Sequence, residues 1–211
     1  MLILLDLDGT LTDPYDGITR SVAHAVARMG LPGLEERELR SFIGPPLQDQ
    51  FASLGLDDDG VLRAVSAYRE RFSERGLYEN RVYEGVEPML RALTAASLRL
   101  AVATSKPTNF ADRILAHFGL ADHFQLVAGA TLDGTRRAKA DVIGFALSTM
   151  GVAAEDAVMV GDRAQDIAGA RAHGMRSIGV QWGYAELGEL EAAGADVIVK
   201  TPAELVEVLL R

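Results

Sequence analysis

The stretch LILLDLDGTLTD, residues 2–13, decides the fold. Its first four residues are apolar, which is typical of a buried strand in a parallel sheet. Asp6 and Asp8 follow, and side chains two positions apart on an extended backbone point the same way. Crowded carboxylates repel each other unless a cation or a shared proton lies between them. The stretch therefore predicts a magnesium site in which one Asp is a nucleophile and the other carries a proton; the alternative is an ordinary strand end.

The second half of the chain alternates between two patterns. Short apolar runs predict buried strands at 98–103, 124–128, 157–160, 177–180 and 196–199. Helical spacing predicts helices at 86–96, 107–118, 138–150, 166–173, 185–193 and 201–210. Alternating strands and helices favour an α/β fold, here a Rossmann-like, doubly wound parallel sheet with helices on both faces. Ligands bind such sheets beyond the carboxyl ends of the strands.

Residues 15–81 lack a strand pattern and instead show apolar residues at helical spacing. We expect an all-helical domain, 15–81, inserted into a Rossmann-like core formed by 1–14 and 82–211. Gly44 and Pro45 begin a Gly-Pro-Pro interruption between two of these helices. This rigid loop is either a substrate-contacting element or a simple helix connector.

Bulk composition narrows the classes of function. The 211 residues are 48% hydrophobic and 24% charged, include no cysteine, and carry a net charge of −9. The negative charge disfavours a nucleic-acid partner, and the absence of a long apolar run or a basic leader disfavours a membrane span or signal peptide. We expect a cytoplasmic protein that acts on a small molecule, with a monomer as the default state.

DLDGTLTD, residues 6–13, resembles the first motif of phosphatases in the haloacid dehalogenase superfamily, Asp-x-Asp-x-Thr. Thr104, at the end of a predicted strand, matches the second motif, and Lys139 matches the third-motif lysine, although Ala140 replaces the usual proline. The segment from Gly161 to Asp166 resembles the fourth motif, Gly-Asp-x-x-x-Asp. All four motifs occur in order; no single motif decides the resemblance, but the set is specific.

The resemblance implies a mechanism. Asp6 would attack phosphorus and form an aspartyl-phosphate, and Asp8 would act as the general acid and base. Thr104, Ser105 and Lys139 would bind the phosphate, and the helical insert would close over the site as a lid.

The resemblance also implies a magnesium cofactor. Asp6, the main-chain carbonyl of Asp8, and Asp162 would ligate Mg²⁺, which prefers oxygen ligands. Asp166 would orient bound water or Asp162. Lys106 competes with Lys139 for the neutralising role, and we favour Lys139 from its distance to the last motif.

Several features resemble phosphoglycolate phosphatases and a nearby group of 5′-nucleotidases, namely 43–47, 76–80 and 105–107. Three other functions stay open: a phosphosugar mutase of the same superfamily, a receiver-like phospho-switch, and a binding module on an inactive scaffold. Gly161 disfavours the mutase, which often has Glu there. Trp182 and Tyr184 could line the rim of the site or serve only in packing.

Overall fold

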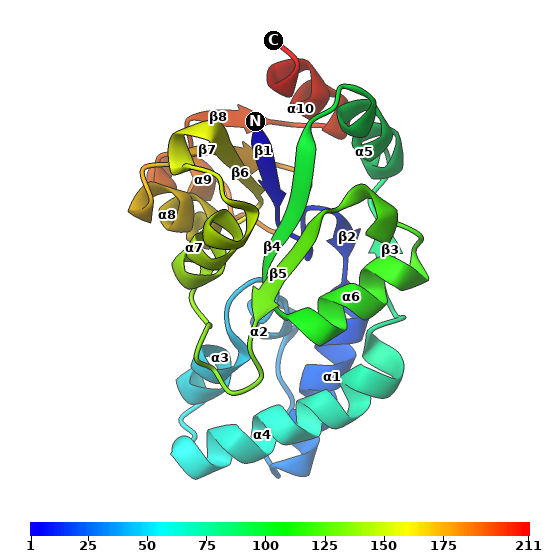
Figure 1. Ribbon diagram of the computed structural model, residues 1–211. Helices are drawn as coiled ribbons and strands as arrows, with labels where there is room; N and C mark the ends of the chain where they lie inside the picture. Colours follow the sequence, from blue (N-terminus) through cyan, green and yellow to red (C-terminus); the bar gives the residue numbers. More distant parts are fainter. The chain divides into compact units, whose positions relative to one another are not determined.

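A six-stranded parallel sheet forms the centre of the larger part of the chain (Figure 1). The computed structural model describes residues 1–211. The strand order is β5-β4-β1-β6-β7-β8. These strands are β1 (Leu2–Leu5), β4 (Arg99–Pro107), β5 (Leu126–Ala130), β6 (Ala157–Gly161), β7 (Arg176–Val180) and β8 (Val197–Val199).

The apolar run at the start of the chain lies in the middle of this sheet. Leu2 of β1 aligns with Arg99 of β4 on one side and with Ala157 of β6 on the other. All four residues of β1 are fully buried. From β1 the chain adds β4 and β5 on one side, and then returns to the other side of β1 to add β6, β7 and β8. Such a change of direction places a ligand crevice beyond the carboxyl ends of the strands.

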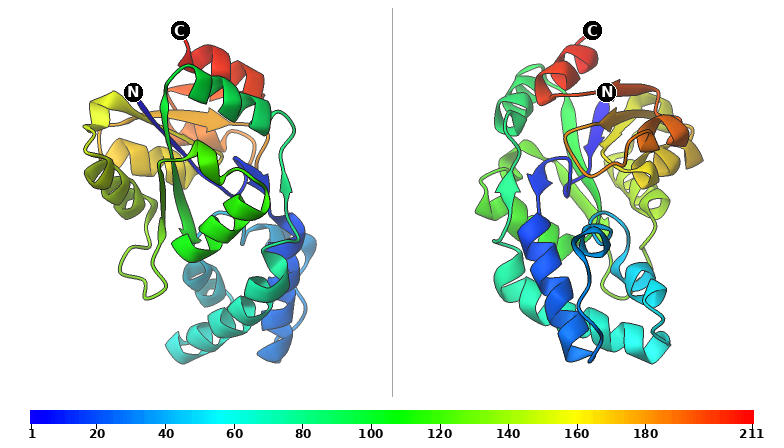
Figure 2. Two further views of the ribbon diagram at one scale, coloured as in Figure 1. Left: turned by 45° about the vertical axis from the view of Figure 1, so that its right-hand side comes forward. Right: turned by 180° about the vertical axis from the view of Figure 1, so that it is seen from behind.

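Helices cover both faces of the sheet, as Figures 1 and 2 show. They are α5 (Val86–Ala95), α6 (Thr108–His117), α7 (Lys139–Met150), α8 (Ala164–Ala172), α9 (Glu189–Ala193) and α10 (Pro202–Leu209), with short 3-10 turns at Ala121–His123 and Ala154–Asp156. Residues of α7 and α8 pack with Leu2 and Leu4 in one apolar cluster. In Figure 2, α5 and α10 lie side by side on the other face. The predicted Rossmann-like, doubly wound fold is confirmed.

Some predicted boundaries were wrong for local reasons. The helix expected at 185–193 is reduced to α9, because Gly188 has a left-handed φ of 80° immediately before it. The strand expected at 124–128 begins two residues later, after the Ala121–His123 turn. The strand expected at 98–103 extends to Pro107, with an irregular register against β5 after Thr104.

Pro14–Arg81 forms a second compact unit, separate from the unit made of Met1–Asp13 and Val82–Arg211. It contains α1 (Tyr15–Arg28), α2 (Glu36–Arg40), α3 (Leu47–Ser53), α4 (Asp58–Arg71) and the π-helix η1 (Phe72–Gly76). Two short paired strands that the sequence did not suggest, β2 (Thr12–Asp13) and β3 (Arg81–Val82), lie at the ends of the insert.

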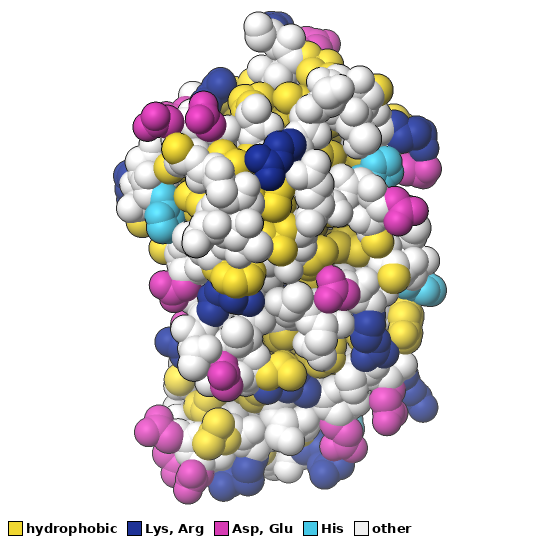
Figure 3. Space-filling view, viewed as in Figure 1, with side chains coloured by type: hydrophobic (Ala, Val, Ile, Leu, Met, Phe, Trp, Pro, Cys, Tyr) yellow, Lys and Arg dark blue, Asp and Glu magenta, His cyan; other side chains and the backbone are white.

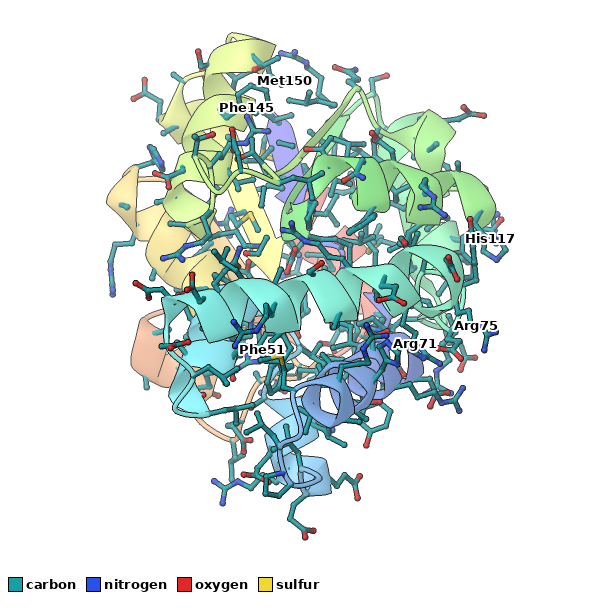
Figure 4. All side chains as sticks on the ribbon, turned by 90° about the horizontal axis from the view of Figure 1, so that it is seen from below. Phe51, Arg71, Arg75, His117, Phe145 and Met150 are labelled. Carbon is teal, nitrogen blue, oxygen red and sulfur yellow. The ribbon has the colours of Figure 1, made fainter.

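Partly buried polar contacts link segments of this second unit. Arg71 at the end of α4 donates to both carboxylate oxygens of Glu79, at 2.7 and 2.9 Å, and to the hydroxyl of Ser21 on α1 at 3.2 Å. Figure 4 shows Arg71 beside α1 and Arg75 near the same end of α4. A bidentate arginine–carboxylate pair fixes geometry as well as adding energy.

The backbones of α1 and η1 approach each other closely at Gly17, and a substitution there tests how tightly the two segments pack. A Cβ atom on Gly17 would lie 2.0 Å from the carbonyl oxygen of Gly76, so the two segments would have to separate. We expect Gly17→Ala to lower the free energy of unfolding by about 1–3 kcal/mol, measured by urea denaturation. Gly33→Ala is the matched control, because no atom lies within 4 Å of its Cβ position. Equal losses in the two variants would contradict this account.

The surface is mixed in charge. On the face that Figure 3 shows, acidic and basic side chains are interspersed rather than gathered in one tract. No helix of the structure combines the length and apolar character that crossing a bilayer requires.

Candidate active site

Six buried charged side chains gather at the carboxyl ends of the central strands. They belong to the loop after β1, to β4, and to the loops and helices that follow β5 and β6. They are Asp6, Asp8, Lys106, Lys139, Asp162 and Asp166, each 8% exposed or less. Charged side chains are rarely buried unless they are paired or bind a metal.

Asp6 is held in place by its backbone and by Lys139. The backbone N–H of Asp6 donates to the carbonyl of Val160 at 2.9 Å, which continues the ladder between β1 and β6. Its Oδ1 accepts from the N–H of Leu7 at 2.8 Å and lies 2.9 Å from Nζ of Lys139. One carboxylate oxygen is therefore fixed by two donors.

Lys139, the first residue of α7, has three oxygen partners for its three donors. Besides Asp6, its Nζ lies 2.7 Å from Oδ1 of Asp166 and 3.1 Å from the carbonyl oxygen of Ala103. Burial alone would lower the pKa of Lys139, but the carboxylates of Asp166 and Asp6 outweigh burial and raise this pKa. The side chain is thus a fixed cation.

Lys106 pairs with the other aspartate of the first loop. Its Nζ lies 2.7 Å from Oδ2 of Asp8. Burial raises the pKa of Asp8 despite the opposing effect of Lys106. From the sequence, Lys106 and Lys139 compete for the role of neutralising the nucleophile and the substrate phosphate. In the structure Lys106 pairs with Asp8, whereas Lys139 pairs with Asp6.

Asp162 follows β6 and is fully buried. Its Oδ1 accepts from the hydroxyl of Thr10 at 3.2 Å, and its Oδ2 accepts from the backbone N–H of Tyr184 at 2.8 Å. Burial and, after it, the carboxylates of Asp166 and Asp6 raise the pKa of Asp162 well above its ordinary value. Thr10 is part of the first motif, but the sequence did not indicate that its hydroxyl bonds to Asp162.

A divalent cation fits this arrangement. Asp6, Asp162 and Asp166 each offer a carboxylate oxygen, and these oxygens lie within 4.8 Å of one another. When these three aspartates are ionised, they outnumber their one lysine partner, Lys139, by two charges, which one divalent cation would balance. Oxygen-only donors suit Mg²⁺. Asp166, expected only to orient its neighbours, also accepts from the N–H of Arg163 at 3.0 Å.

Of the three predicted phosphate-binding residues, Lys139 belongs to this cluster, and Thr104 and Ser105 lie on β4 next to Lys106. Thr104 is buried, and its hydroxyl accepts from the N–H of Lys106 at 3.2 Å. Ser105 lies between them and is partly exposed. Gly44 and Pro45 belong to the helical unit, in the loop between α2 and α3; their contact with substrate stays a prediction.

The sequence model of the haloacid dehalogenase-like hydrolase family matches residues 3–180 of this chain. The chain therefore belongs to that family, and within it the chain is a phosphoric monoester hydrolase. A 5′-nucleotidase from Pseudomonas aeruginosa is 48% identical over 90% of this chain and 86% of its own length. A protein named tyrosine-protein kinase PtkA, from Mycobacterium tuberculosis, is 42% identical over 97% of this chain and 67% of its own length.

The fold of this chain is also similar to that of a solved structure. The crystal structure of a predicted phosphatase from Clostridium acetobutylicum is 40% identical to this chain, with a TM-score of 0.96. The match covers 99% of this chain and 97% of the other. The family resemblance indicated by residues 6–13 is confirmed.

Proposed function

We propose that the protein is a magnesium-dependent phosphatase that hydrolyses a small phosphomonoester through an aspartyl-phosphate on Asp6. One observation carries the proposal: Asp6 contacts the buried cation of Lys139 and also belongs to a group of three carboxylates that fits a metal ion. A nucleophilic carboxylate must meet a phosphate group that is itself negative. Fixed positive charge around Asp6 removes that repulsion.

In the first step, an oxygen of Asp6 attacks phosphorus and the bond from phosphorus to the leaving oxygen breaks. Asp8 gives its proton to that leaving oxygen, so the product departs as a neutral alcohol. The raised pKa of Asp8 supports this role, because the protonated form is then more populated than in a solvent-exposed aspartate. In the second step, Asp8 takes a proton from water, the water oxygen attacks phosphorus, and the bond to Asp6 breaks.

The remaining residues of the site bind and orient the substrate. Lys139 and the backbone N–H groups near Asp8 and Ser105 stabilise charge on the phosphoryl oxygens. Mg²⁺ would be held by Asp6, the main-chain carbonyl of Asp8, and Asp162. When bound, it would supply Lewis-acid stabilisation of the transferring phosphoryl group.

For the substrate, we propose a nucleoside monophosphate, supported by the relative that is named a 5′-nucleotidase. A phosphoglycolate-like ester is the alternative suggested by sequence resemblance. We propose that Pro14–Arg81 acts as a cap, with Gly44 and Pro45 contacting the part of the substrate beyond the phosphate. The relative named a tyrosine-protein kinase makes an aryl phosphate the second candidate.

A substrate panel tests this proposal directly. We expect phosphate release with Mg²⁺ and its loss with EDTA, measured on nucleoside monophosphates, 2-phosphoglycolate, sugar phosphates and a phosphotyrosine peptide. Preference for nucleoside monophosphates supports the proposed substrate, whereas preference for the phosphotyrosine peptide favours the second candidate. Interconversion of a sugar phosphate without phosphate release would indicate the mutase. No turnover of any compound by folded, Mg²⁺-loaded protein would contradict the proposal.

A further inference from the structure

The segment Trp182–Tyr184 follows β7. It contacts both Asp162 and the loop between Asp8 and β2. The indole Nε1 of Trp182 donates to the backbone carbonyl of Thr10 at 2.9 Å. Next to it, a Cβ atom on Gly183 would lie 2.3 Å from the carbonyl oxygen of Gly9 and 2.4 Å from Oδ2 of Asp162. The segment thus lies directly against the loop between Asp8 and β2, and only a glycine fits at its middle position.

Tyr184 makes one hydrogen bond through its backbone and another through its side chain. Its backbone N–H donates to Oδ2 of Asp162 at 2.8 Å, and its hydroxyl donates to Oδ1 of Asp13. Asp13 is the last residue of β2 and the last residue before the helical unit. Tyr184 and Asp13 are buried, at 7% and 8% exposure, so their bond is shielded from solvent. The hydroxyl of Tyr184 also has a hydrogen bond with the hydroxyl of Tyr83.

We infer that Tyr184 is a positioning residue that fixes the carboxylate of Asp162 for cation binding and ties it to Asp13 on β2. The inference rests on the proposed role of Asp162 as a magnesium ligand. Partners of a metal ligand restrict its rotation, and their loss weakens metal binding. Because one residue supplies both bonds, a shift of Asp13 moves the donor that orients Asp162. Cation affinity is therefore coupled to the strand through which the chain enters its helical unit.

A packing role would give a different result from a positioning role. If Tyr184 only filled space, removal of its hydroxyl would lower thermal stability and leave cation affinity unchanged. Tyr184→Phe separates the two roles, because it keeps the ring and the backbone N–H to Asp162 while deleting the hydroxyl that bonds to Asp13 and also contacts the hydroxyl of Tyr83. Tyr78→Phe, at an exposed tyrosine of the helical unit, is the matched control.

The experiment is calorimetric titration of the metal-free full chain with MgCl₂, together with thermal unfolding of each variant. We expect Tyr184→Phe to raise the Kd for Mg²⁺ about tenfold and Tyr78→Phe to leave it unchanged. Asp13→Asn keeps an oxygen that can accept from Tyr184, so its Kd should rise less than that of Asp13→Ala. The double variant Tyr184→Phe/Asp13→Ala should lose no more affinity than the weaker-binding single variant, since both remove the same bond.

Three results would overturn the inference in distinguishable ways. If the wild-type chain binds Mg²⁺ and folded Tyr184→Phe binds it within a factor of two of wild type, Tyr184 does not position Asp162, and the proposed phosphatase mechanism stands. If the wild-type chain binds no Mg²⁺, the proposed metal site itself fails. Additive losses from Tyr184→Phe and Asp13→Ala would also overturn the link, because residues that act through one shared bond are not additive.

Discussion

Asp6→Asn is expected to reduce phosphatase turnover by about 10⁴-fold or more. The amide cannot form the acyl-phosphate bond, whereas its size is nearly that of the carboxylate. The backbone bond to Val160 does not involve the side chain, so the fold should be retained. Initial rates of phosphate release measure the effect, and acid-quenched enzyme should retain covalent phosphate only when Asp6 is present.

The control for this variant is Asp141→Asn, an exposed aspartate two positions after Lys139. It makes the same chemical change outside the cluster and should keep wild-type turnover. Mass spectrometry must show that the amide introduced by Asp6→Asn has not deamidated back to the carboxylate. Appreciable turnover by such a verified, folded variant would exclude Asp6 as the nucleophile.

Lys139→Met is expected to have the second-largest effect. Methionine has a similar length but no charge, so Asp6 and Asp166 would lose their shared cation inside the protein. Removing one partner of a buried ion pair costs about 3–5 kcal/mol. We expect this loss in the free energy of unfolding with EDTA present, and a smaller loss with Mg²⁺, which replaces part of the missing charge.

Turnover by Lys139→Met should fall by about 10³-fold, because fixed charge near the transferring phosphoryl group contributes several kcal/mol. Lys139→Arg should not restore it, since a planar guanidinium cannot reproduce the three contacts of the ammonium. Lys200→Met, at an exposed lysine, is the control for the substitution itself. Wild-type turnover in Lys139→Met would remove this residue from the proposed mechanism.

The sequence was most informative where a site residue follows an apolar strand. Asp6, Thr104 and Asp162 each stand at such a point, and parallel strands bring their carboxyl ends to one edge of a sheet. That all three lie at this edge could therefore be predicted from local patterns and the parallel direction of the strands. The same logic predicted the sheet and most of its helices.

Contacts between distant segments could not be predicted in this way. Trp182 and Tyr184 bond to residues 172 and 171 positions away along the chain, and no local pattern indicates such partners. The separate partners of Lys106 and Lys139 depend on how far β4 extends, and its extension past residue 103 was not visible in the apolar run. The predicted start of the helix at residue 185 was wrong for a simpler reason. Gly188 has a left-handed φ, and the presence of a glycine in the sequence does not reveal its φ.

The position of β1 in the sheet has a consequence for how the protein folds during synthesis. β1 is made first, but both of its neighbours, β4 and β6, begin at Arg99 and Ala157. Pro14–Arg81 is continuous in sequence, so its contacts can form while LILL still lacks its partner strands. Pairing over such separations slows folding and leaves apolar strands exposed to aggregation. We therefore expect β1, the strand that leads into Asp6, to be among the last parts of the nascent chain to be protected.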